Sequence, residues 1–227
     1  MYAADGKTIK EYAGDGFFVR GIDIEGGCGS AFAIDNMENF FFFGPGGDSV
    51  AIVRTDRNGK TVNSFGLHYR TTGNSFQKRA QQFRDLFISP DNFLVAVGRS
   101  YPSVETYSPD GKLLNSQLLP DSAIQSTYNR FVMQQAKKPD SFSALYSDIY
   151  LYKNKLFILH SAISGGSSFN RLLVWDLSAC KVNLERCYHL NMPDGTDPSF
   201  DKMCVLNDST IVVSDMISVS FCYFNIK

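Results

Sequence analysis

A short turn motif returns along the chain at an almost constant interval. It occurs as Asp5-Gly6-Lys7, Asn58-Gly59-Lys60 and Asp110-Gly111-Lys112, so the three glycines are 53 and 52 residues apart. Asp-Gly and Asn-Gly pairs supply the positive φ angles of a tight turn between two antiparallel strands. The sequence therefore predicts a repeated unit of roughly fifty to sixty residues, with a hairpin in each copy.

A second series of polar breaks interrupts strand-like apolar runs between these turns. The breaks end at Asn39, Asn92, Asn154 and Asp208, at intervals of 53, 62 and 54 residues. Because the two series interleave, each repeat should hold four antiparallel strands, which is the composition of a β-propeller blade. Runs such as Phe40 to Phe43 are apolar throughout, as expected of strands buried on both faces.

We interpret the whole chain, residues 1–227, as one all-β propeller domain with about four blades and short helical insertions. The expected blades span about 30–66, 83–119, 148–190 and 200–227. The last of these lacks a fourth strand, and residues 1–13 are expected to supply it as an outermost strand. Periodicity leaves two arrangements open, a ring of four blades or a ring with further blades upstream of Met1.

The run Phe32-Ala33-Ile34-Asp35, the segment from Val50 to Lys60 and the pair Phe65-Gly66 resemble an NHL-type blade, and the second blade repeats the pattern. Across nearly its whole length the chain is similar to six-bladed, TolB-like propellers, found as exported lipoproteins in Bacteroidota and mostly of unknown function. The resemblance implies a partial member, since six blades need about 340 residues. It also implies a periplasmic or cell-surface location and a lipid anchor ahead of Met1.

Composition and cysteine spacing exclude several other classes of protein. The chain carries 22 basic and 23 acidic residues, so no nucleic acid or anionic membrane is expected as partner. No apolar run is long enough to span a bilayer, and the first residues do not form a signal peptide, which leaves a cytoplasmic location open. Of five cysteines only Cys180 and Cys187 flank one turn; they could pair, although buried free thiols are the commoner arrangement.

Catalytic motifs are not recognisable in the sequence. The three histidines are scattered, and neither a phosphate-binding loop nor a nucleophile elbow is present. We therefore favour a noncatalytic binding propeller of the cell envelope, without a cofactor. The alternative is a metal-dependent hydrolase or lactonase, in which Ca²⁺ would be held by dispersed oxygen ligands that sequence reasoning does not detect.

Three long connections between blades could carry binding groups. Residues 74–86 place Phe76, Ala80, Phe83 and Phe87 at helical spacing, which predicts a short helix with Ser75 as N-cap and with Lys78, Arg79 and Arg84 on or near its other face. Residues 122–146 are expected to form a solvated loop. Residues 193–201 hold three carboxylates that could bind calcium, but turn chemistry explains them better.

In a propeller, the connections from the second to the third strand of a blade and from the fourth strand to the first strand of the next blade emerge on the same face. Both kinds of connection are long here, and Gly44 to Asp48 and Ser164 to Asn170 are examples. We expect a pocket on that face. Its expected ligand is anionic or a peptide, with a protein or a glycan as further possible partners. The candidate binding residues are His68, Arg70, Arg79 and Arg99.

Overall fold

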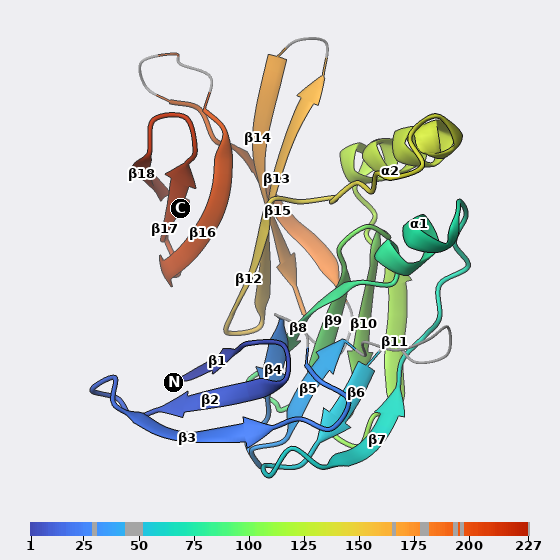
Figure 1. Cartoon of the computed structure of the whole chain (residues 1–227). Helices are drawn as coiled ribbons and strands as arrows, with labels where there is room; N and C mark the ends of the chain where they lie inside the picture. The colour runs from blue at the N-terminus through green and yellow to red at the C-terminus, as the bar shows by residue number, and fades with distance from the viewer. Residues whose placement is uncertain are drawn as a thin grey trace. The chain divides into compact units, whose positions relative to one another are not determined.

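The structure is a computed structural model, and it describes residues 1–28, 31–43, 52–164, 167–177, 182–192, 195 and 198–226, with the backbone alone at 161–164 and 167–169. Small antiparallel sheets dominate it, as Figure 1 shows. The chain divides into two compact units. The first comprises residues 1–118 and 130–142, and the second comprises residues 119–129 and 143–227.

The first unit contains three sheets, ordered β1-β2-β3, β4-β5-β6-β7 and β8-β9-β10-β11. The strands of the first sheet are β1 (Tyr2–Ala4), β2 (Thr8–Tyr12) and β3 (Phe18–Asp23). Those of the second are β4 (Phe32–Ile34), β5 (Phe40–Phe43), β6 (Ile52–Thr55) and β7 (Thr61–Phe65). Those of the third are β8 (Arg84–Ile88), β9 (Leu94–Gly98), β10 (Ser103–Tyr107) and β11 (Leu113–Leu118).

The second unit contains two sheets, ordered β12-β13-β14-β15 and β16-β17-β18. The four strands of the first are β12 (Asp148–Tyr152), β13 (Lys155–Ser164), β14 (Ser167–Asp176) and β15 (Asn183–His189). The three strands of the second are β16 (Phe200–Asn207), β17 (Thr210–Asp215) and β18 (Ser220–Asn225). All described strand pairs in both units are antiparallel, as in propeller blades.

The described residues form five blades, so the prediction of about four is wrong. The expected role of the N-terminus is also wrong, because β1 pairs with β2, and β2 pairs with β3, instead of completing the sheet of β18. The ladder over Phe18–Asp23 explains the difference. The sequence analysis assigns no strand to residues 18–23. In the structure these residues form β3, which pairs with β2 and so gives the N-terminal strands a sheet of their own.

The repeated turns adopt the conformation that their glycines predict. Gly59 has φ of 83° and Gly111 has φ of 90°, and each turn joins the last two strands of a four-stranded sheet. In the first of these turns the Asp56 carboxylate accepts hydrogen bonds from the Asn58 and Lys60 N–H groups at 2.9 and 3.0 Å. The turn at Gly6 is a hairpin turn too, but it joins the first two strands of its sheet and is out of phase with the others.

Neighbouring sheets within each unit pack through apolar side chains. Phe41 of β5 and Tyr107 of β10 are both at most 1% exposed and belong to the core between the second and third sheets. In the second unit, Leu172 and Val213 lie in the corresponding core between the two sheets. Burying apolar surface on both faces of a strand requires continuous apolar runs, which is why Phe40 to Phe43 does not alternate with polar residues.

Two predicted connections differ from their expected form. The helix α1 spans only Ser75–Ala80, its N-cap is Asn74 in place of Ser75, and Phe87 belongs to strand β8. Residues 122–146 are not a loop, because they contain helix α2 (Ser122–Gln134) and a 3₁₀ turn, η1 (Gln135–Lys137). Asp121 caps α2 by accepting hydrogen bonds from the Ala123 and Ile124 N–H groups, at 3.0 and 2.9 Å. Within the described residues, no helix has the length and apolar character needed to cross a membrane.

Candidate functional site

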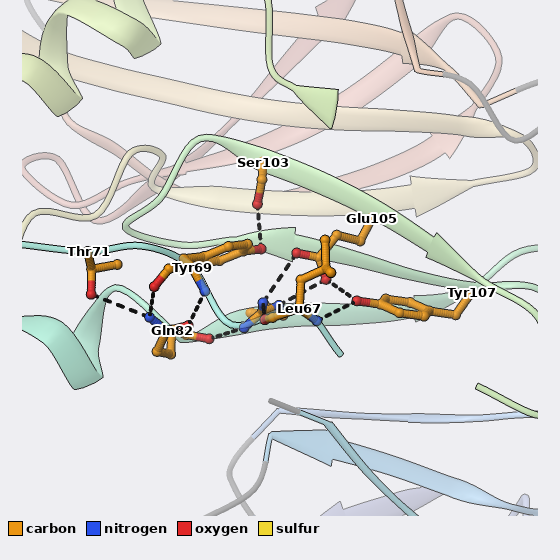
Figure 2. Close-up of polar contacts among 8 residues, drawn as sticks. Leu67, Tyr69, Thr71, Gln82, Ser103, Glu105 and Tyr107 are labelled. Atoms are coloured by element: carbon orange, nitrogen blue, oxygen red, sulfur yellow. Dashed lines mark hydrogen bonds and ion pairs between the residues drawn. The ribbon is translucent and has the colours of Figure 1, made fainter. Parts of the chain in front are cut away.

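The connection between β7 and β8 (residues 66–83) carries three of the four predicted binding residues. It runs as an extended segment through His68 and Arg70, and then forms α1, which carries Arg79. Figure 2 shows the polar contacts that hold the extended part of this connection against the third sheet. The geometry of these contacts determines which side chains the segment presents.

A buried ion pair forms the centre of these contacts. The side chains of Arg84 on β8 and Glu105 on β10 are both 0% exposed, and two guanidinium nitrogens of Arg84 each lie 3.2 Å from a carboxylate oxygen of Glu105. Arg84 also donates to the backbone carbonyls of Gln82 and Leu67. Buried charges are tolerated only when they are paired and hydrogen-bonded, and here both conditions are met.

Tyr107 connects this ion pair to the extended segment. Its hydroxyl donates to the Glu105 carboxylate and accepts a hydrogen bond from the Leu67 N–H group, at 3.1 Å in the second case. Burial and the neighbouring Glu105 carboxylate raise the pKa of Tyr107 above its usual value, so the phenol remains a proton donor over the whole physiological range. Leu67 is therefore held from both its N–H and its carbonyl group.

Tyr69 is the second anchor of the segment. The carboxamide of Gln82 accepts from the Tyr69 N–H group at 2.9 Å and donates to the Tyr69 carbonyl at 3.0 Å, as a paired β-strand would do. The Tyr69 ring lies beneath the Arg84 guanidinium and stacks on Tyr101 with ring centroids 4.3 Å apart. Its hydroxyl accepts a hydrogen bond from Ser103, and burial raises its pKa well above the usual value.

These anchors orient the neighbours of Tyr69 outward. Adjacent side chains of an extended segment point to opposite sides. Because Tyr69 is 6% exposed and faces the protein, His68 and Arg70 on either side of it are exposed. The structure thus places two of the predicted binding residues, His68 and Arg70, at exposed positions of a segment whose backbone is held by hydrogen bonds.

The other two predicted residues have different surroundings. Arg79 is exposed in the last turn of α1. Arg99 follows β9, where it forms an ion pair with Asp85 at 3.6 Å, and its backbone N–H group donates to the Phe83 carbonyl. The positive charge of Arg99 is therefore partly balanced within the protein.

Arg84 is expected on or near the other face of the helix and is instead fully buried on strand β8, so that part of the sequence interpretation is wrong. The reason is that residues 84–88 pair with β9 as a strand, which directs Arg84 toward Glu105. Glu105 was missed altogether. A signal was available, since a lone carboxylate inside the strand-like run Val104 to Tyr107 needs a buried cation or proton donor as partner.

Several predicted features lie wholly or partly outside the described residues. They include the loop Gly44 to Asp48, two glycines of the segment Ser164 to Asn170, residues 193, 194, 196 and 197 of the possible calcium segment 193–201, and Cys180. Cys187 is a free thiol, so its pairing with Cys180 is not borne out, and it is exposed where free thiols on strands were expected to be buried. Among the residues that are described, no group of three or more His, Cys, Asp or Glu side chains is placed to hold a metal ion.

A second, partly buried ion pair lies in the other unit, where α2 begins. The guanidinium of Arg171 on β14 binds both carboxylate oxygens of Asp121, at 3.0 and 2.7 Å. Burial opposes the ionised form of Asp121, but the hydrogen bonds from Arg171 and the Ile124 N–H group outweigh it and lower the pKa of this carboxyl. This pair fixes the first turn of α2 to the sheet of β14.

Comparisons with known proteins identify the fold. No model of a known protein family matches the sequence, and no curated protein matches it either. A streptogramin B lyase structure matches 98% of this chain and 63% of its own, with a TM-score of 0.53 at 12% identity. A functionally unknown protein from Desulfotomaculum acetoxidans matches 99% and 64%, with a TM-score of 0.57 at 13% identity.

A gluconolactonase from Xanthomonas campestris also matches, over 97% of this chain and 66% of its own, with a TM-score of 0.50 at 16% identity. The chain thus spans less than two thirds of the length of these three proteins. Likeness at such low identity extends to the fold alone. Together with the five antiparallel sheets, it shows that this chain is built from β-propeller blades.

Proposed function

We propose that the protein is a noncatalytic binding propeller that takes an anionic ligand, such as an acidic peptide, on the connection between β7 and β8. The observation that carries the proposal is the anchoring of Tyr69, which leaves His68 and Arg70 exposed on either side of it. Ligand-binding residues are commonly placed on connections held by a rigid scaffold. Arg79 and Arg99 add positive charge on the neighbouring α1 and after β9.

The charge of this surface supports an anionic ligand over a cationic one. From residue 66 to residue 83 the connection contains Arg70, Lys78 and Arg79 but no Asp or Glu. Arginine suits carboxylates because its planar guanidinium can donate two parallel hydrogen bonds. Exposed charges attract weakly in water, so the ligand needs several carboxylates to be bound firmly.

The experiment uses N-acetylated, C-amidated tetraglutamate as probe and isothermal titration calorimetry as readout. Arg70→Ala and Arg99→Ala are each expected to weaken binding about threefold, the effect of losing one exposed charge contact. Arg57→Ala is the matched control, because Arg57 is exposed in the turn at the other end of β7. Binding that is unchanged in both test variants, or that weakens equally in the control, contradicts the proposed site.

A wider form of the proposal concerns the whole protein. The resemblance to exported NHL-like and TolB-like propellers supports a six-bladed ring. It also supports a location in the periplasm or at the cell surface, with attachment to the membrane through a lipid anchor. Sequencing the gene upstream of Met1 tests this directly. An open frame with a signal peptide, a lipid-attachment cysteine and further blade sequence is expected, and an in-frame stop immediately before Met1 contradicts it.

A metal-dependent lactonase is the alternative, favoured by the likeness of fold to the gluconolactonase. In such an enzyme Ca²⁺ or another divalent cation would be held by dispersed oxygen ligands. Elemental analysis of the purified protein and hydrolysis of gluconolactone with and without added metal distinguish the two functions. Tightly bound metal with metal-dependent turnover favours the enzyme, whereas metal-free protein without turnover favours the binding propeller.

A further inference from the structure

The extended part of the connection between β7 and β8 uses its backbone groups in the pattern of a β-strand (Figure 2). The Leu67 N–H group donates to the Tyr107 hydroxyl at 3.1 Å, and the Leu67 carbonyl accepts from Arg84. Two positions on, the N–H group and the carbonyl of Tyr69 bind the two ends of the Gln82 carboxamide, at 2.9 and 3.0 Å. In a strand the N–H and C=O groups of every second residue point to one edge, so this segment has one edge turned toward the protein.

The opposite edge of the segment carries the backbone groups of His68 and Arg70. Within the part of the chain that the structure describes, neither residue forms a hydrogen bond through its N–H group or its carbonyl. Both residues are exposed. A row of unpaired N–H and C=O groups is a template for pairing with another strand. The segment therefore has the properties of an edge strand whose outer side is open.

The side chains on this edge determine which strand can pair with it. His68 and Arg70 are two positions apart in an extended segment, so their side chains point to the same side. Opposite charges directly across a pair of strands stabilise it, and like charges destabilise it. Pairing the segment with the same segment of a second copy would bring positive side chains together. An acidic strand, by contrast, places a carboxylate opposite each of the two side chains.

We propose that an acidic peptide binds here by β-strand addition, as an antiparallel strand along the outer edge of residues 67–71. Glutamates at alternate positions of the peptide lie opposite His68 and Arg70. The backbone of each glutamate exchanges two N–H···O hydrogen bonds with the residue opposite to it. The inference rests on the anionic ligand proposed above and adds the conformation in which that ligand binds. Main-chain hydrogen bonds supply affinity that exposed charges in water do not.

The probe is the peptide Thr-Glu-Val-Glu-Thr, acetylated at its N-terminus and amidated at its C-terminus, because threonine and valine favour an extended chain. In antiparallel pairing, the N–H groups of the two glutamates point toward the protein and that of the central valine points away. N-methylation of the second glutamate removes one hydrogen bond and should weaken binding at least about tenfold in isothermal titration calorimetry. N-methylation of the valine is the matched control, and it should leave the affinity unchanged.

Variants of the protein test the same edge from the other side. His68→Pro removes the N–H donor at position 68, and the φ angle of proline is compatible with an extended segment. His68→Ala loses the same side chain but keeps the donor. His68→Pro should therefore bind the probe about five- to tenfold more weakly than His68→Ala. If His68→Pro does not fold, the two methylated peptides still decide the outcome.

Hydrogen exchange of the unaltered protein reports on the individual backbone groups. In the free protein the N–H groups of Leu67 and Tyr69 should exchange slowly, because both are hydrogen-bonded, whereas those of His68 and Arg70 should exchange rapidly. Saturation with the probe should slow exchange at His68 and Arg70. Exchange that stays rapid at both residues overturns the proposal.

Two further results contradict strand addition in different ways. If Arg70→Ala weakens binding but both methylated peptides bind as well as the probe does, the anionic site stands and strand addition is wrong. If the free protein associates with itself and this protects His68 and Arg70 from exchange, the edge belongs to a second copy of the chain. Absence of binding by the probe and by tetraglutamate alike overturns the proposed function together with this inference.

Discussion

The guanidinium of Arg84 lies over the ring of Tyr69, 3.9 Å from its centroid. The two residues come from different parts of the chain, a connection and the strand that follows it, and both are buried. The contact combines cation–π attraction with the ion pair to Glu105. It is the reason that His68 and Arg70 have a defined position, so changes to this network test both the fold and the proposed binding surface.

Removing one member of the Arg84–Glu105 pair should be more damaging than removing both. Arg84→Met or Glu105→Leu alone leaves a buried charge without its partner and should lower the free energy of unfolding by about 3–5 kcal/mol. The double variant leaves no such charge and should lose less than either single variant. Urea unfolding of the four proteins measures this coupling. A double variant whose loss equals the sum of the single losses contradicts it.

Gly98 should tolerate no side chain. A Cβ atom there would lie closer to the Tyr101 carbonyl oxygen than real Cβ contacts do, and Tyr101 stacks on Tyr69. Gly98→Ala should therefore lower the free energy of unfolding by about 1–3 kcal/mol. Gly14→Ala is the control, since a Cβ atom at Gly14 meets nothing within 4 Å. Thermal unfolding followed by circular dichroism compares them, and equal stability of the two variants would refute the steric argument.

Asp121 stabilises the start of α2 in two ways that substitutions can separate. Asp121→Asn keeps an oxygen for the Ala123 and Ile124 N–H groups but loses the charge that pairs with Arg171, and should cost about 1–3 kcal/mol. Asp121→Ala also removes the cap and should cost about 1 kcal/mol more. Asp140→Asn, at an exposed position, should change stability by less than about 0.5 kcal/mol. Chemical denaturation checks this order, which fails if the Asn and Ala variants are equally stable.

His160 should make stability depend on pH in a narrow window. Burial, followed by the charge of Arg171, lowers the pKa of His160 below its ordinary value of 6.5, and Asp121 opposes this only in part. Below pH 6.5 the unfolded chain therefore binds a proton at this residue that the folded protein does not yet bind. The free energy of unfolding should therefore fall as the pH decreases below 6.5. Above pH 6.5 His160 is neutral in both the folded and the unfolded protein, so it no longer makes stability depend on pH.

Urea unfolding at about pH 7.5 and about pH 5 measures the effect, because an ordinary histidine changes charge between these values. His160→Gln should flatten the difference between the two. The Asp121 carboxyl does not interfere, since its pKa lies below the ordinary 3.8 and its contribution is lost only in more acidic solution. A slope that persists unchanged in His160→Gln would assign the pH dependence to other groups.

Local sequence patterns specify the repeating strands and their turns. Glycines such as Gly59 and Gly111 mark tight turns through their backbone freedom, and the flanking apolar runs mark buried strands. These are local properties, encoded within a few residues. The sequence also holds a local signal for α2, since Asp121 precedes the helically spaced apolar residues Ile124, Tyr128 and Phe131, although the composition of residues 122–146 favours a loop.

Contacts between distant residues depend on how the strands and connections pack in three dimensions. Helical spacing of phenylalanines predicted a helix through Phe87, but pairing with β9 made residues 84–88 a strand and buried Arg84 against Glu105, 21 positions along the chain. Long-range pairing likewise placed the N-terminal strands in a sheet with β3. Such contacts are stabilised by the burial of apolar surface and by backbone hydrogen bonds between strands that lie far apart in the sequence. A pattern within a few neighbouring residues therefore does not specify them.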